Sequence, residues 1–171
     1  MKGYVHVYTG DGKGKTTAAL GLALRAAGAG LKVFIAQFVK GMRYSELNAL
    51  ERFSDLITLK RYGRDCFICR HPEEEDIRLA KQGLEEFKTL IASSAYSLVI
   101  LDEANIGTHY NLFSVDELLD VIDEKPEGVE LVITGRYADP RIQAKADLVT
   151  EMREVKHYFA EGVEARKGIE S

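Results

Sequence analysis

A glycine- and lysine-rich stretch near the N-terminus holds the residues best suited to bind phosphate. It reads Thr9-Gly10-Asp11-Gly12-Lys13-Gly14-Lys15-Thr16 and lies between a strand-like and a helix-like segment. A strand that turns through glycines into a helix directs several backbone N–H groups at one spot, where they attract anions. We therefore expect a P-loop in which Lys15 contacts phosphates and the Thr16 hydroxyl binds magnesium.

This loop departs from the usual P-loop pattern at Thr9, which stands where the first glycine is normally found. The three glycines that follow still leave the backbone open to an anion. The alternative is a glycine-rich surface turn with solvated lysines, and the order of strand, loop and helix argues against it. The nucleotide-binding residues expected here are Gly10, Asp11, Gly12, Lys13, Gly14, Lys15, Thr16 and Thr17.

Two carboxylates follow the most apolar segment of the chain. Asp102 and Glu103 come directly after the strand-like residues 97–101. Ligands of open parallel sheets bind at the carboxyl ends of the strands, so these acids should face the P-loop. An acidic strand end without a function is the simpler alternative, but the loop favours a site. We expect Thr16, Asp102 and Glu103 to hold Mg²⁺, or Mn²⁺ in its place, directly or through water. Lys15, Thr16 and Glu103 are the expected catalytic residues.

Three further basic residues are candidates for ligand contacts. Arg136 follows the apolar residues 129–134, where a guanidinium could bind phosphate with two hydrogen bonds. A surface arginine is the alternative. Arg25 faces either nucleotide or solvent, and Lys40 ends the second strand-like segment, where it would contact ATP or a second substrate.

A C-x-x-C sequence, Cys66-Phe67-Ile68-Cys69, precedes the longest helical pattern. A zinc or redox site would need further ligands or a thioredoxin-like context, and the sequence has neither. Two unrelated thiols are therefore the favoured interpretation.

Hydrophobic segments alternate with helical patterns along the chain, which is typical of βαβ units and a mainly parallel sheet. We expect an α/β fold of the P-loop NTPase (RecA-like) type, with helices on both faces of the sheet. The expected strands are residues 4–8, 32–38, 56–62, 97–101, 129–134 and 147–152. The expected helices are residues 16–27, 44–53 and 73–93, one that starts at the capping box 114–117 and ends before Pro126, and a short one near Pro140. In the first of these helices, Leu20, Leu24 and Ala27 lie on one face.

Length, charge and composition limit the remaining possibilities. A chain of 171 residues fits one domain, residues 1–171. Its net charge of −4 argues against a nucleic-acid partner. No apolar run reaches the roughly 18 residues of a membrane span, and two cysteines cannot form a disulfide framework. We expect a cytoplasmic protein that contacts no membrane.

Several motifs occur together in one order along the whole chain. Besides the P-loop with Thr17-Ala18-Ala19, they are Gln37-Phe38-Val39-Lys40-Gly41, Val99-Ile100-Leu101-Asp102-Glu103, Ile133-Thr134-Gly135-Arg136, and a tail containing Val155-Lys156-His157 and Gly162-Val163-Glu164-Ala165-Arg166-Lys167-Gly168-Ile169-Glu170. In this combination the chain resembles the ATP:corrinoid adenosyltransferases, which act on cobyrinic acid diamide and cobalamin.

The resemblance implies an unusual use of the P-loop. A Co(I) corrinoid would attack the 5′ carbon of ATP, forming a cobalt–carbon bond and releasing inorganic triphosphate. ATP would lie in reversed polarity relative to ordinary P-loop hydrolases, so the loop would hold the leaving group. Lys15 and magnesium would stabilise the charge that develops there.

The resemblance also implies how the corrinoid is held and reduced. Phe67 would contact a corrinoid that has lost its lower axial ligand, while Cys69 stands where relatives have tryptophan. Many relatives carry an N-terminal extension that covers the corrinoid site, whereas the first strand here begins almost at Met1, so we expect that cover to be missing or to be replaced by the partner subunit. A flavoprotein reductant and a homodimer are further expectations. The competing interpretations are a P-loop small-molecule kinase or NTPase, and a nucleotide-dependent corrinoid-binding or regulatory protein without transfer activity.

Overall fold

A single parallel sheet organises the chain in the computed structural model, which describes residues 2–39, 45–63 and 72–170. The sheet has six strands in the order β3-β2-β4-β5-β1-β6, and every paired neighbour is parallel. The strands are β1 (Val5–Thr9), β2 (Val33–Phe38), β3 (Ile57–Tyr62), β4 (Leu98–Asp102), β5 (Glu130–Thr134) and β6 (Leu148–Glu151). The expected α/β fold of P-loop NTPase type is confirmed.

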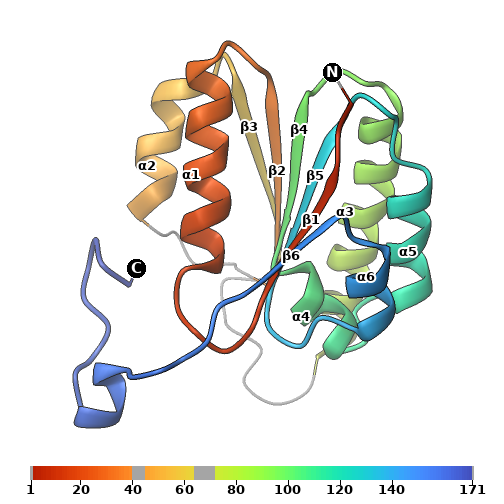
Figure 1. Ribbon diagram of the computed structural model, residues 1–171. Coiled ribbons are helices and arrows are strands. Elements are labelled where there is room, and N and C mark those ends of the chain that lie inside the picture. Colours follow the sequence, from red (N-terminus) through yellow and green to blue (C-terminus); the bar gives the residue numbers. More distant parts are fainter. Residues whose placement is uncertain (1, 40–44, 64–71, 171) are drawn as a thin grey trace.

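Helices cover both faces of this sheet, as Figure 1 shows. On one face lie α1 (Lys15–Gly28) and α2 (Ser45–Leu50), the latter continued by the 3₁₀ turn η1 (Glu51–Phe53). The other face carries α3 (Glu74–Ala92), α5 (Val115–Asp123) and α6 (Pro140–Lys145). A short helix, α4 (Ala104–His109), follows β4, and the 3₁₀ turn η2 (Tyr158–Glu161) lies in the C-terminal segment.

Alternate residues of the central strands pack into two separate cores. In β2, Phe34 packs with Phe87 of α3, whereas its neighbour Ile35 packs with Ala23 of α1 on the opposite face. Every residue of β2 and of β4 is buried. Burial on both faces explains why these strands are continuous apolar runs and do not alternate with polar residues.

The expected elements are present, with ends shifted by one or two residues, and the capping box of Ser114 and Glu117 starts α5 as predicted. Two details of the prediction were wrong. Leu24 is 45% exposed, because α1 packs on the sheet through smaller residues such as Ala23 and Ala27. Helix α4 was not predicted, since six residues are too few to show a helical period. No helix within the described ranges is long and apolar enough to cross a membrane.

Strand order brings three loops to one edge of the sheet. Strand β5 lies between β4 and β1, with Leu101 level with Ile133 and Tyr8 level with Thr134. The carboxyl ends of these neighbours therefore meet. They lead into the P-loop, into Asp102-Glu103 and into Gly135-Arg136, which places these three groups of sequence-predicted residues around one space.

Candidate functional site

The P-loop contains two glycines with positive φ and ends at the start of α1. Gly10 has φ 93° and Gly14, the N-cap of α1, has φ 120°, values that residues with a Cβ atom rarely adopt. Thr9, in contrast, is the last residue of β1 and its φ is not positive. Its hydroxyl accepts a hydrogen bond of 3.3 Å from the Ala138 N–H. This explains why the first glycine of the usual pattern is dispensable here.

Backbone from beyond β6 supports the loop on its outer side. The Gly12 N–H donates to the Met152 carbonyl at 2.7 Å, and the Met152 N–H donates to the Thr9 carbonyl at 2.8 Å. A Cβ atom on Gly12 would lie 2.7 Å from the Met152 oxygen, far inside van der Waals contact. The loop thus keeps its shape through contacts that only glycine permits.

The Lys15 side chain lies over the loop and is 8% exposed. Its Nζ donates to the carbonyls of Gly10 and Gly12, each at 2.7 Å. These bonds compensate a charge that would be costly to bury alone. They also keep the ammonium group at the centre of the loop, within reach of a bound phosphate chain.

Asp102 is the buried centre of a hydrogen-bond network at the start of α1. Its Oδ1 accepts from the Thr16 hydroxyl at 2.9 Å and from the Thr134 hydroxyl at 2.7 Å, and its Oδ2 accepts from the Gln37 amide at 3.2 Å. Asp102 and Thr134 are fully buried, and Gln37 almost so. The structure therefore brings Thr16 and Asp102 together, as their roles in a magnesium site would require.

The donor set fits a hard divalent cation held largely by the nucleotide. Hydroxyl and carboxylate oxygens are suitable Mg²⁺ ligands, and Mg²⁺ at phosphate sites typically binds only one or two carboxylates plus phosphate oxygens and water. The described part of the chain has no cluster of three or more His, Cys, Asp or Glu residues that could hold a metal ion.

Glu103 adopts a left-handed backbone conformation at the mouth of the site. Its φ is 61°, its N–H donates to the Thr134 hydroxyl at 3.0 Å, and it is the N-cap of α4. Such a conformation costs a non-glycine residue on the order of 1 kcal/mol. The turn places Glu103 on the wall of the cavity, next to the fully buried Asp102.

A cavity of about 810 Å³ opens over the loop and α1. Of the sequence-predicted residues, its lining includes Gly12, Lys13, Lys15, Thr16, Thr17, Glu103 and Arg136. Ser45, Glu46 and the C-terminal residues 168–170 form other parts of the wall. Lys13 is bonded to this C-terminal segment through Glu170 at 2.8 Å.

Other predicted residues lie around this cavity or away from it. The Arg136 guanidinium donates to the Asp11 carbonyl at 3.1 Å, so both residues brace the loop. Arg25 is exposed and lies roughly 15 Å along α1 from Lys15, at 1.5 Å of rise per residue. The structure does not bring it to the loop. Lys40, Phe67 and the Cys66–Cys69 pair are outside the described residues.

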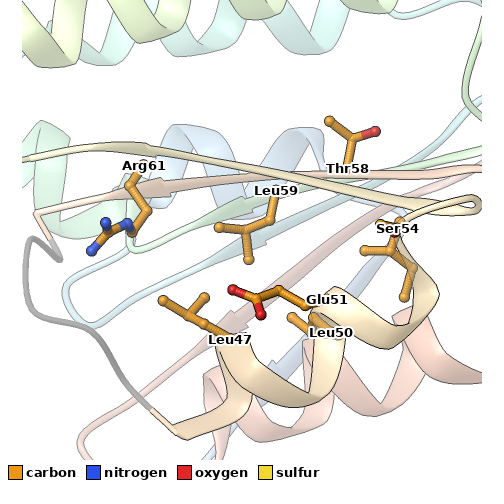
Figure 2. A pocket seen from close by; sticks show the side chains of 8 residues that line it. Leu47, Leu50, Glu51, Ser54, Thr58, Leu59 and Arg61 are labelled. Atoms are coloured by element: carbon orange, nitrogen blue, oxygen red, sulfur yellow. The ribbon is translucent and has the colours of Figure 1, made fainter.

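A second cavity, of about 440 Å³, lies between α2 and the edge strand β3 (Figure 2). Its wall is mainly apolar, with side chains of Leu47, Leu50 and Leu59, and the charged groups of Glu51 and Arg61 lie beside them. Among the residues that the structure describes, its lining includes no glycine loop and no α-helix N-terminus that would bind phosphate. The cavity over the P-loop is therefore the candidate site.

Several residues of the site were not singled out from the sequence. Gln37 and Thr134 bond to Asp102, and the Asn105 amide donates to the Gly135 carbonyl at 3.2 Å. Gln37 and Thr134 carried a signal, because each is a polar residue at the carboxyl end of an otherwise apolar strand. Glu170 stood only within the C-terminal motif, without an assigned contact, and Asn105 had no signal, since its partner is set by tertiary contacts.

Comparison with known proteins gives one consistent result. The family profile described as ATP:corrinoid adenosyltransferase BtuR/CobO/CobP matches residues 1–171. A corrinoid adenosyltransferase of Sinorhizobium sp is 36% identical over 172 residues, covering 99% of this chain and 80% of that protein. The corrinoid adenosyltransferases of Pseudomonas aeruginosa and Escherichia coli K12 are 35% and 36% identical over 170 residues, covering 99% of this chain and 84% and 86% of theirs.

Proposed function

The chain belongs to the family of ATP:corrinoid adenosyltransferases, and we propose that its P-loop holds the triphosphate of ATP as the leaving group of the transfer. The enzyme transfers the adenosyl group of ATP to a corrinoid. The observation that carries the proposal is the buried Asp102 carboxyl group, which accepts a hydrogen bond from Thr16, the residue that follows Lys15 at the start of α1. These groups are suited to bind and stabilise a charged phosphate chain, not to generate a nucleophile.

The electron pair that forms the new bond comes from the metal of the substrate. Co(I) attacks the 5′ carbon, the cobalt–carbon bond forms, and the C5′–O5′ electron pair leaves with triphosphate. No proton has to be removed, so the protein needs no general base. Lys15, the backbone N–H groups of the loop and the N-terminus of α1 stabilise the charge that develops on the departing oxygen.

Thr16, Asp102 and Glu103 would hold magnesium, or manganese in its place, in this proposal. When bound, the ion neutralises charge on the leaving triphosphate. The Thr16–Asp102 bond of 2.9 Å supports this assignment, because the two oxygens are close enough to share one cation and its water shell. Gln37 and Thr134 keep the Asp102 carboxylate oriented.

We propose the remaining contacts and partners as well, and family membership is their support. Lys40 and Phe67 contact the corrinoid, and Gly10, Asp11, Gly14 and Arg136 shape or bind the triphosphate. A flavoprotein supplies the electron that makes Co(I), and the protein acts in the cytoplasm, where ATP is available. It forms a homodimer, to which exposed apolar residues on β6 would contribute.

Product analysis tests this function. Purified protein with ATP, Mg²⁺ and chemically reduced cobalamin should give a light-sensitive adenosylated corrinoid and one equivalent of intact triphosphate. ADP as the product would instead identify a kinase or NTPase. If the corrinoid absorbance changes with ATP but no product forms, the chain is a binding or regulatory protein.

Lys15→Ala tests the role of the loop. We expect at least about a 100-fold loss of transfer, because one preorganised donor to a developing charge contributes on this scale. The rate of triphosphate release measures it, and Lys32→Ala, outside the cavity, serves as the control. Full activity of Lys15→Ala would refute the assigned role.

A further inference from the structure

The Lys13 side chain is bonded to the C-terminal segment. Its Nζ donates to the Glu170 carboxylate at 2.8 Å, to the Ile169 carbonyl at 3.0 Å and to the Tyr158 hydroxyl at 3.2 Å. The segment leaves the sheet after β6, passes through η2 and returns to the N-terminal end of α1 (Figure 1). One loop lysine therefore anchors the last residues of the chain.

Glu170 is held firmly by its own neighbours. The Arg166 backbone N–H donates to Oε2 at 2.8 Å, the Arg166 guanidinium donates to both carboxylate oxygens, and the Tyr158 hydroxyl donates to Oε1. The Glu170 side chain is only 15% exposed, against 41% for Lys13. Hydrogen bonds from Arg166, Lys13 and Tyr158 lower the pKa of Glu170, so its carboxylate stays charged at neutral pH.

This carboxylate lies on the wall of the triphosphate cavity. Glu170 lines the same space as Lys15 and Thr16. A phosphate chain bound there and the Glu170 carboxylate are both anions, and both are suited to bind the Lys13 ammonium group. Like charges close together also repel, so the two cannot gain fully from Lys13 at the same time.

We propose that Glu170 is an internal competitor of triphosphate for Lys13, and that it weakens the binding of the inorganic triphosphate product so that it can leave. This inference rests on the proposed role of the P-loop. Triphosphate displaces the carboxylate from Lys13 on binding, and the carboxylate binds Lys13 again as the product departs. A loop with several cations would otherwise retain a polyanion strongly, and product release often limits turnover.

Binding of inorganic tripolyphosphate to the full-length protein, with Mg²⁺ at low salt, tests the inference by calorimetry. Glu170→Gln should bind the probe about three- to fivefold more tightly than the parent protein, the scale of a partly exposed ion pair. Raising the salt concentration should reduce the difference, since screening weakens both interactions. The matched control is Glu161→Gln, which makes the same charge change in the same segment but removes a pair with Lys156. It should leave the affinity unchanged.

Two further variants show whether the effect passes through Lys13. In a Lys13→Ala background, Glu170→Gln should change the affinity for tripolyphosphate little, because the ammonium group for which the two anions compete is absent. Glu170→Asp keeps the negative charge, but its shorter side chain holds the carboxylate farther from Lys13. It should therefore tighten tripolyphosphate binding by a smaller factor than Glu170→Gln. Thermal melting establishes that each variant is folded.

Equal or weaker binding of tripolyphosphate by both Glu170→Gln and Glu170→Asp would overturn the inference, because Glu170 would then assist the site. Failure of the parent protein to bind tripolyphosphate at all is a separate result, and it would contradict the proposed function of the P-loop itself.

Discussion

At the scale of single residues, the central feature is the carboxyl group of Asp102 at the end of β4. Asp102 is fully buried, and a lone ion there would be strongly unfavourable. Hydrogen bonds from Thr16, Thr134 and Gln37 compensate that cost and fix the carboxylate orientation. The opposite oxygen of the Gln37 amide is buried without a hydrogen-bond partner within the described part of the chain. A buried amide oxygen without a hydrogen bond is unfavourable, so we infer that the hydrogen bond from Gln37 to Asp102 matters for the site.

Gln37→Leu should therefore impair magnesium binding more than overall folding. With one donor lost, the Asp102 carboxylate is less well oriented, and we expect about a tenfold higher Mg²⁺ concentration for half-maximal transfer, the equivalent of a hydrogen bond to a charged group. A magnesium titration of ATP binding measures the same shift without turnover.

Gln143→Leu is the matched control for this substitution. Gln143 lies in α6, outside the cavity lining, and its amide donates to the Ala138 carbonyl at 2.8 Å. We expect a small loss of stability and an unchanged magnesium midpoint. An unchanged midpoint in Gln37→Leu as well would mean that Gln37 serves packing alone.

At the scale of elements, β3 and α3 are joined by a contact between a ring and a helix backbone. A Cβ atom on Gly83 would lie 2.4 Å from the Tyr62 ring, so glycine lets the ring lie close to α3. The same ring stacks on Phe38 at 5.7 Å between centroids. Its hydroxyl donates to Glu86 at 2.8 Å, and Lys60 donates to the same oxygen at 3.0 Å.

These contacts predict a specific dependence of stability on pH. The hydrogen bonds from Tyr62, Lys60 and Gln82 lower the pKa of Glu86 from 4.5 to about 2. A carboxyl group whose pKa is lower in the folded state stabilises the fold above its unfolded pKa, and this contribution is lost as pH falls from about 4.5 towards 2. Glu86→Gln should lower the free energy of unfolding at pH 6, and the difference from the parent protein should shrink below pH 4.5.

Urea unfolding at pH 6 and pH 3.5 measures this difference. The control is Glu85→Gln, one position earlier in α3, where the carboxylate lies 3.5 Å from Lys88. Its stability should follow that of the parent protein at both pH values. A Glu86→Gln curve parallel to the parent curve would contradict the assigned role of Glu86.

At the scale of the whole molecule, the sheet ends at β6 in a strand that is exposed along its length. Leu148 and Val149 are 41% and 43% exposed, although they lie on opposite faces of the strand. Apolar residues on an open strand edge are suited to an interface with another chain. The homodimer proposed above would cover this edge.

Leu148→Glu should weaken that dimer, because a buried carboxylate without a partner is unfavourable at an interface. Light scattering across a dilution series measures the dissociation constant, which we expect to rise about tenfold or more. Val155→Glu is the control, since Val155 is 94% exposed outside the sheet. If neither variant changes the oligomeric state, β6 is not the interface.

Local patterns in the sequence determined the P-loop, the order of the elements and the acidic end of β4. The reason is that glycine turns, helix caps and apolar runs act between neighbours along the chain. For the same reason the capping box of Ser114 and Glu117 was predicted correctly. The position of the loop next to Asp102 also followed, since parallel strands place their carboxyl ends on one edge.

The tertiary structure alone decided which side chains complete that site. Gln37 bonds to Asp102 because β2 pairs with β4, and Glu170 meets Lys13 because the chain returns to the loop after β6. The exposure of Leu24 likewise depends on how closely the alanines of α1 approach the sheet. Contacts between residues far apart in the chain depend on strand order and packing, and neither leaves a periodic trace in the sequence.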